Sequence, residues 1–171
     1  MYVYGKNVAK ELIRNNKKIT KAYLMNDFKD DEILDGLKKF NVIPKYMDKK
    51  NLDRIDNGNH QGIIIEIEDY KYIEEKQMLN NLPENPFIVV LDHLEDTHNF
   101  GAIIRTCEAA GVDYIIIPKN RSVSVNSTVY KTSSGALNNV KIVEVVNLSN
   151  TIRKLQDLGY WVYGAEANGV D

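Results

Sequence analysis

The chain has 171 residues, of which 43% are hydrophobic and 27% charged, a composition typical of a soluble globular protein with one large domain or two small ones. The formal net charge is -2, so bulk charge gives no sign of nucleic-acid binding, and such a function must be argued from local motifs. The single cysteine excludes an intrachain disulfide. No apolar run resembles a signal peptide or a membrane span, so we expect a cytoplasmic protein with no membrane partner.

The first part of the chain, from Met1 to about Asp69, alternates short helical and extended patterns, which predicts a small α/β domain. Helices are expected at 7–15, 30–40 and 49–55, and strands at 19–25, 43–47 and 62–67. Residues 70–86 are polar and contain two prolines, which favours a linker with one or two helical turns.

From Phe87 onward, apolar runs alternate with amphipathic segments, which predicts a parallel sheet. Strands are expected at 87–91, 114–117, 140–146 and 160–165, and helices at 102–110, 148–158 and over part of 127–137. The chain ends at Asp171, soon after the fourth of these strands. Because a doubly wound sheet rarely ends without a covering helix, we expect the natural protein to continue.

The stretch LDHLEDTHNFGAIIRTCEAAG, residues 91–111, reads as a buried strand, a polar loop and a helix. Ligands of parallel α/β sheets bind beyond the carboxyl ends of the strands, where Asn99 and Arg105 are placed by this pattern. Arg105 interrupts an almost entirely apolar helix, and a buried guanidinium requires a carboxylate or phosphate partner. The alternatives are a helix N-cap for Asn99 and a solvated surface arginine for Arg105.

Several common sites are not predicted. The sequence has neither a GxGxxG motif after the first strand of this part nor a P-loop. The three histidines, His60, His93 and His98, do not show zinc-like spacing with Cys107, so no metal is expected.

Two segments are locally basic. No Asp or Glu occurs between Asp113 and Glu144, a span with Lys119, Arg121, Lys131 and Lys141. Residues 1–29 contain seven lysines and arginines against two acidic residues, or 7 − 2 = +5. Both segments are suited to RNA phosphates, although ordinary solvated surfaces have the same composition. The residues predicted to bind RNA are Lys6, Arg14, Lys17, Lys18, Arg121, Lys131 and Ser134.

These segments resemble one known family. LDHLEDTHNFGAIIRTCEAAGVDYIII is similar to the first signature motif of SpoU/TrmH-type RNA methyltransferases, and KTSSGALNNVKIVEVVNLSNTIRKLQDLGYWVYGA resembles the stretch that follows it. YGKNVAKELI and HQGIIIEI look like the start and end of the small ribosomal-protein-like domain that precedes the catalytic domain in 23S rRNA guanosine 2′-O-methyltransferases. The resemblance covers essentially the entire chain.

The resemblance implies an α/β protein with an RNA substrate-binding domain at 1–69, a linker at 70–86 and, at 87–171, the N-terminal part of a parallel-sheet α/β-knot (SPOUT) methyltransferase domain. The family's later motifs, which build the cofactor pocket and complete the knot, are expected after Asp171. Residues 1–171 alone are then expected to lack the knot, to bind little cofactor and to be inactive. Complete family members are expected to form homodimers, but residues 1–171 alone are not expected to supply the whole dimer interface.

The implied activity is transfer of a methyl group from S-adenosylmethionine to a ribose 2′-hydroxyl in RNA, with a guanosine of 23S rRNA as the first choice of target. Arg105 matches the catalytic arginine of the family, and Asn99 matches the asparagine that orders the site. Because the pKa of arginine lies above about 12, we expect Arg105 to orient the substrate and stabilise charge rather than to accept a proton.

Three other functions remain open. A non-catalytic RNA-binding or ribosome-assembly module would keep its RNA affinity after Arg105→Ala. An antibiotic-resistance methyltransferase of the same superfamily would differ in its target nucleotide. A small-molecule α/β enzyme would show no RNA affinity.

Overall fold

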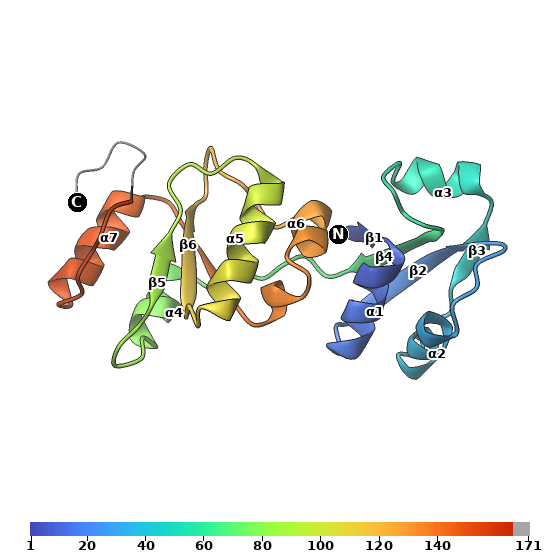
Figure 1. The fold of residues 1–171 in the computed structure, drawn as a ribbon, viewed down its shortest axis with the longest axis horizontal. Coiled ribbons are helices and arrows are strands. Elements are labelled where there is room, and N and C mark those ends of the chain that lie inside the picture. Colours follow the sequence, from blue (N-terminus) through green and yellow to red (C-terminus); the bar gives the residue numbers. More distant parts are fainter. Residues whose placement is uncertain (166–171) are drawn as a thin grey trace.

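The computed structural model describes residues 1–165, which form two β-sheets flanked by helices (Figure 1). The first part contains β1 (Tyr2–Tyr4), α1 (Lys6–Arg14), β2 (Ile19–Met25), α2 (Asp31–Lys39), β3 (Lys45–Met47), α3 (Lys49–Ile55) and β4 (Ile63–Ile67). The second part contains α4 (Glu75–Asn80), β5 (Ile88–Val90), α5 (Thr97–Ala109), β6 (Tyr114–Pro118), α6 (Ser127–Thr132), the 3-10 helix η1 (Ala136–Asn138), β7 (Lys141–Val145) and α7 (Leu148–Asp157). Across residues 1–165, none of the helices combines the length and the apolar character needed to cross a bilayer.

The first sheet has the strand order β1-β4-β2-β3, with β4 antiparallel to both of its neighbours and β2 parallel to β3. In its register, Ala22 of β2 lies opposite Ile65 of β4. Consecutive isoleucines of β4 are buried, because a central strand is covered on both faces. Figure 1 shows α1 and α2 on one side of this sheet and α3 on the other, so this part has three layers.

The second sheet is parallel, with the order β5-β6-β7. Side chains alternate along β6: Ile115 packs in the same core as Phe100 of α5, whereas Ile116 packs in a second core with Met78 of α4 and Leu155 of α7. The alternation places α5 on one face of the sheet and both α4 and α7 on the other.

The hydroxyl groups of two tyrosines at the start of the connecting segment form hydrogen bonds with the backbone of the second part. The Tyr70 hydroxyl donates to the carbonyl of Val140 and accepts the N–H of Ile142, each at 3.3 Å. The Tyr72 hydroxyl accepts the N–H of Val125 at 2.7 Å. The two rings also meet edge to face, with centroids 5.2 Å apart.

Residues 70–86 therefore differ from the linker expected from their polarity. Ile73 pairs with β7, and its N–H donates to a β7 carbonyl at 2.8 Å. In α4, the Glu75 carboxylate accepts the Thr151 hydroxyl at 2.6 Å and binds the Lys154 ammonium at 2.8 Å. The first part of the segment packs on the second sheet, because Ile73 and Met78 join its core and the Glu75 carboxylate binds α7.

One apolar core continues from the first sheet into the second. It includes Val3 of β1 and Leu12 of α1 together with Tyr130 of α6 and Leu137 of η1, each at most 8% exposed. The two parts are therefore joined by packing as well as by the chain.

The strand expected at 160–165 is absent, and these residues are irregular. Gly159 adopts a φ of 92°, and the N–H of Tyr160 donates to the carbonyl of Leu155, which closes the end of α7. Trp161 is 86% exposed. A run of β-formers specifies a strand only when a neighbouring strand pairs with it, and within 1–165 no strand does so.

Two smaller differences have local causes. The strand Tyr2–Tyr4 was not expected, because three residues are too few to show an alternating pattern. The helix expected within 127–137 is divided into α6 and η1, because Ser134 and Gly135 have positive φ angles of 46° and 93°.

The first prediction concerns the Tyr70 hydroxyl. We expect Tyr70→Phe to lower the free energy of unfolding in urea by about 1–3 kcal/mol, because the backbone groups of Val140 and Ile142 lose their partner. Tyr163→Phe, at a side chain that is 86% exposed, is the matched control and is expected to cost less than about 0.5 kcal/mol. Equal losses in the two variants would contradict the role of the hydroxyl.

The second prediction concerns alkaline pH. Burial raises the pKa of Tyr70 to about 12, above the value of about 10 expected in the unfolded chain. The resulting stabilisation is complete below about pH 10 and is lost as the pH rises toward 12, because the unfolded chain releases its proton first. From about pH 10 to about pH 12, wild type should lose roughly 1–3 kcal/mol more of its free energy of unfolding than Tyr70→Phe loses. Parallel curves in urea titrations would contradict this prediction.

Candidate functional site

Helix α5 carries both residues of the predicted motif, and it begins at Thr97 rather than after Gly101. The Asp96 carboxylate caps this helix by accepting the N–H of Asn99 at 2.6 Å. Asn99 therefore lies in the first turn with an exposed side chain. The alternative in which Asn99 itself caps the helix is wrong, because Asp96 holds that position.

Arg105 lies on the exposed face of α5, contrary to the expectation of a buried guanidinium. The buried residues of this helix are Phe100, Gly101, Ile104 and Cys107. Several alanines that made the helix look apolar throughout are exposed, since an alanine costs little at a surface. Within residues 1–165, the Arg105 guanidinium has no ion pair or side-chain hydrogen bond.

Asn99 and Arg105 do not point in the same direction. Arg105 lies six positions after Asn99, which corresponds to about 120° around the helix axis and about 9 Å along it. The groove that Arg105 lines is not lined by Asn99. The spacing thus places both residues on one helix, but the described residues do not bring their side chains together.

A groove of about 820 Å³ lies between α1 of the first part and α5 of the second. Arg105 lines one wall, Glu11 and Asn15 of α1 line the opposite wall, and Ser134 and Gly135 line the turn between them. The groove offers one guanidinium with fork-like donors together with two carboxylates, those of Glu11 and Glu108, and several amides and hydroxyls. Such a set can bind a sugar hydroxyl beside a phosphate.

Gly135 lies against the end of the Glu11 side chain across the groove. That flexible side chain can move aside from a Cβ, so glycine is required here by the φ of 93°. Burial raises the pKa of Glu11, and the charge of Arg14 opposes this with a smaller effect. In the sequence, Glu11 is only one of the two acidic residues that offset the basic N-terminal patch, because Gly135, its neighbour across the groove, lies in a distant segment.

Folding neutralises much of that basic N-terminal patch. Four cations bind carboxylates that lie farther along the chain: Lys10–Asp30 (3.1 Å), Arg14–Glu32 (2.6 Å), Lys18–Glu68 (2.7 Å) and Lys21–Glu66 (2.9 Å). A count over residues 1–29 does not include these carboxylates. Arg14 and Lys18, both predicted RNA ligands, are thus paired in this structure, although exposed pairs of this kind exchange easily.

The other predicted RNA-binding residues are dispersed. The Lys6 ammonium lies 5.1 Å from the centre of the Phe28 ring, and that of Lys131 lies 5.8 Å from the Tyr4 ring. Arg121 is exposed in a loop with a positive φ of 53°.

Lys17 and Lys18 line a cavity of about 360 Å³ at the junction of the two parts, with Lys141 on the same lining. Ser134, in contrast, belongs to the Arg105 groove. The seven residues therefore do not form one continuous surface patch. In the described part of the chain, no cluster of three or more His, Cys, Asp or Glu side chains is arranged to hold a metal ion.

Two sequence models of protein families match the chain in consecutive segments. One, the SpoU rRNA Methylase family, matches residues 86–171. The other, described as RNA 2′-O ribose methyltransferase substrate binding, matches residues 2–73. The first contains α5 and Arg105, and the second contains α1 on the opposite wall of the groove.

Curated relatives align over nearly the whole chain. A TrmH family tRNA/rRNA methyltransferase of Bacillus subtilis (strain 168) is 34% identical over 173 residues, which is 98% of this chain and 70% of the relative. A protein of the same name from Staphylococcus haemolyticus is 38% identical over 172 residues, or 97% of this chain and 69% of the relative.

Two solved structures share the fold. An AdoMet-bound rRNA methyltransferase from Sinorhizobium meliloti has a TM-score of 0.68 at 20% identity, covering 91% of this chain and 57% of that chain. The SpoU methyltransferase AviRb from Streptomyces viridochromogenes, in complex with AdoMet, has a TM-score of 0.70 at 14% identity, covering 93% and 59%. The expected α/β fold with a parallel sheet is confirmed. This chain spans less than two thirds of either solved chain.

The third prediction concerns Gly101, which lets α5 approach α6. A Cβ at Gly101 would overlap the Thr132 side chain, so Gly101→Ala is expected to cost about 1–3 kcal/mol of unfolding free energy in urea. Thr132→Ala removes the nearest obstructing atom, Oγ1, although the Cβ of residue 132 stays 2.6 Å away. The double variant Gly101→Ala/Thr132→Ala should therefore lose less than the sum of the two single variants. Strict additivity would show that the two side chains do not collide.

Proposed function

Because the chain belongs to the SpoU/TrmH family of RNA methyltransferases, we propose that it is part of an enzyme that methylates a ribose 2′-hydroxyl in RNA with S-adenosylmethionine as donor. The target that we propose is a guanosine of 23S rRNA. The names of the relatives admit both tRNA and rRNA. We further propose that the complete protein is a homodimer that acts in the cytoplasm.

One observation carries the proposal. The exposed guanidinium of Arg105, which forms no ion pair within residues 1–165, lines a groove whose opposite wall belongs to the segment matched by the substrate-binding family. An RNA strand held by the first part would pass this guanidinium. The two solved neighbours named as complexes with AdoMet support the choice of methyl donor.

The described residues do not by themselves build a site for S-adenosylmethionine. At the carboxyl end of β7, a cavity of about 300 Å³ is lined by Glu75 and Glu144, and Glu75 is already bound to Thr151 and Lys154. The resemblance places the cofactor-binding motifs after Asp171, and this remains our expectation.

Arg105 is proposed to act on the RNA. A guanidinium is a poor proton acceptor but a good bidentate ligand for the phosphate next to the target ribose. Bidentate binding would fix the ribose, and the positive charge would stabilise the oxyanion that develops on the 2′-oxygen. The Glu11 carboxylate lines the same groove, and burial raises its pKa.

The reaction is tested with the protein extended to the length of its relatives, beside residues 1–171. Both are incubated with methyl-labelled S-adenosylmethionine and undermethylated bulk rRNA or bulk tRNA, and the RNA is digested to nucleosides. We expect label in 2′-O-methylguanosine from rRNA with the complete protein only. Label on a base, or RNA binding without any labelling, would contradict the proposed reaction, and the latter would favour a non-catalytic RNA-binding module.

The fourth prediction tests Arg105 in the complete protein. Arg105→Lys keeps the charge but loses the fork of donors, and we expect kcat to fall by a factor of about 10²–10³. Arg153→Lys, on the exposed surface of α7, is the matched control and should keep wild-type turnover. Near-normal turnover of Arg105→Lys would show that the guanidinium has no such role.

A further inference from the structure

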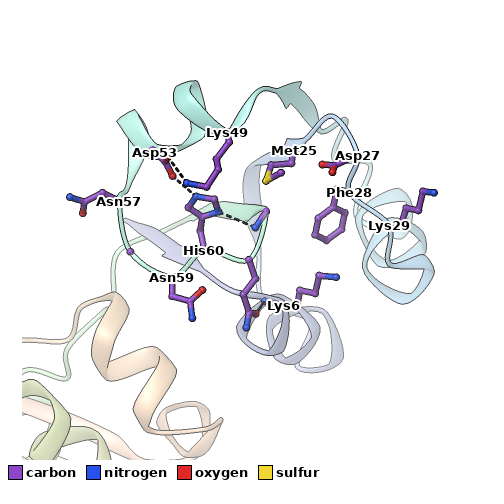
Figure 2. A pocket seen from close by; sticks show the side chains of 13 residues that line it. Lys6, Met25, Asp27, Phe28, Lys29, Lys49, Asp53, Asn57, Asn59 and His60 are labelled. Atoms are coloured by element: carbon purple, nitrogen blue, oxygen red, sulfur yellow. Dashed lines mark hydrogen bonds and ion pairs between the residues drawn. The ribbon is translucent and has the colours of Figure 1, made fainter.

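A second cavity, of about 550 Å³, lies within the first part of the chain and shares no lining residue with the Arg105 groove. It is enclosed by the loop after β2, the start of α1, helix α3 and the loop at 57–62 (Figure 2). Its volume lies in the range of about 300–1,000 Å³ that is common for small-ligand sites. Nothing in the proposed methyl transfer uses it.

A buried histidine fixes one wall of this cavity. His60 is 5% exposed, and its Nδ1 accepts the N–H of Gly62 at 2.9 Å. Because Nδ1 is an acceptor, the ring proton resides on Nε2, which donates to the Asp53 carboxylate at 2.8 Å. Both contacts are drawn in Figure 2. With both nitrogens engaged, the imidazole positions the loop and is not free to act as a general base.

The same loop is held from two further directions. Asp53 also binds the Lys49 ammonium at 3.0 Å, and the hydrogen bond from His60 followed by that from Lys49 lowers the pKa of this carboxyl. The side-chain oxygen of Gln61 accepts the N–H of Lys6 at 2.9 Å. Gln61 and Gly62 have φ angles of 53° and 84°, and strain of this kind at Gln61 persists only where the surroundings enforce it.

Around this rigid wall, several polar groups have no partner within residues 1–165. The ammonium groups of Lys6 and Lys29 form no ion pair, and the side-chain amides of Asn57 and Asn59 form no hydrogen bond. The Phe28 ring lies beneath Lys6. A side-chain amide both donates and accepts hydrogen bonds, as the edge of a nucleobase does, and an ammonium complements a phosphate.

We propose that this cavity binds one unstacked nucleotide of the substrate RNA, with the ammonium groups of Lys6 and, at the rim, Lys29 on its phosphates and the exposed amide of Asn59 on the edge of its base. Asn57 points outward at the opposite end of the cavity (Figure 2). Protein recognition of RNA sequence commonly uses bases that have left the helical stack. Asp27, on the same lining, adds an acceptor for a base amino group. The assignment rests on the proposed function in taking the substrate RNA as its ligand, but it concerns a site separate from the reacting groove.

Ultraviolet cross-linking tests the contact without any substitution. The complete protein is irradiated with deproteinised bulk rRNA, digested with nuclease and protease, and analysed by mass spectrometry for peptides that carry a nucleotide. We expect adducts on peptides containing residues 25–29 or 57–62. Adducts confined to other peptides, with none on these two, would overturn the proposal.

A matched pair of variants tests the energetic contribution. Lys29→Ala/Asn59→Ala removes one cation and one amide from the cavity, and Lys39→Ala/Asn150→Ala removes the same two groups from exposed helical positions outside it. We expect the cavity variant to bind rRNA about tenfold more weakly, and the slope of log affinity against log salt to fall by about 0.7–0.9. The control variant should match wild type, and thermal unfolding checks that both fold. Equal affinities of the two variants would overturn the proposal.

Free nucleotides distinguish the source of the ligand. If a mixture of the four nucleoside monophosphates abolishes the cross-links and the cavity variant still binds rRNA normally, the cavity takes a free nucleotide and the RNA assignment is wrong. Failure of methyl transfer alone, with cavity-dependent RNA binding retained, would overturn the proposed reaction but not this site. Normal methyl transfer with cavity-independent binding would overturn only this site.

Discussion

One continuous apolar core beneath both sheets determines where the polar groups of this protein meet. Val3 and Leu12 of the first part pack into the same core as Tyr130 and Leu137 of the second. Burial of side chains of this size contributes roughly 1.5–3 kcal/mol each, far more than any exposed ion pair. The groove between α1 and α5 is a consequence of that packing, since it occupies the surface directly above the shared core.

The charged residues are arranged around this framework in two ways. Along α1 and β2, cations are paired with carboxylates from other elements, as in the Arg14–Glu32 and Lys18–Glu68 pairs. At the two candidate sites, cations such as Arg105 and Lys29 have no such partner within residues 1–165. The net charge of -2 therefore describes neither region. Along α1 and β2 the carboxylates neutralise the cations, whereas at the candidate sites the cations can bind an anionic ligand.

The sequence predicted the elements with strong periodicity and missed those that depend on distant partners. The helix containing Leu12 and the buried strands around Ile65 and Ile115 have local patterns, and they form where they were expected. Tyr70 was assigned to a linker because its partners, two backbone groups of the β7 region, are not visible in a local window. Arg105 was expected to be buried because neighbouring alanines resemble core residues, although the burial of an alanine is decided by the helix that packs against it.

The tyrosine attachment at the junction limits how such proteins can be recombined. The two matched family segments, 2–73 and 86–171, suggest exchangeable modules. Tyr70 and Tyr72 lie at the end of the first matched segment, yet their hydroxyl groups satisfy backbone atoms of the second. A chimaera joined between the segments would separate these tyrosines from their native backbone partners, two N–H donors and one carbonyl acceptor, and each half of the core from its complement. The two matched segments of this chain are therefore joined by a shared core and by hydrogen bonds, and neither is expected to fold as an independent module.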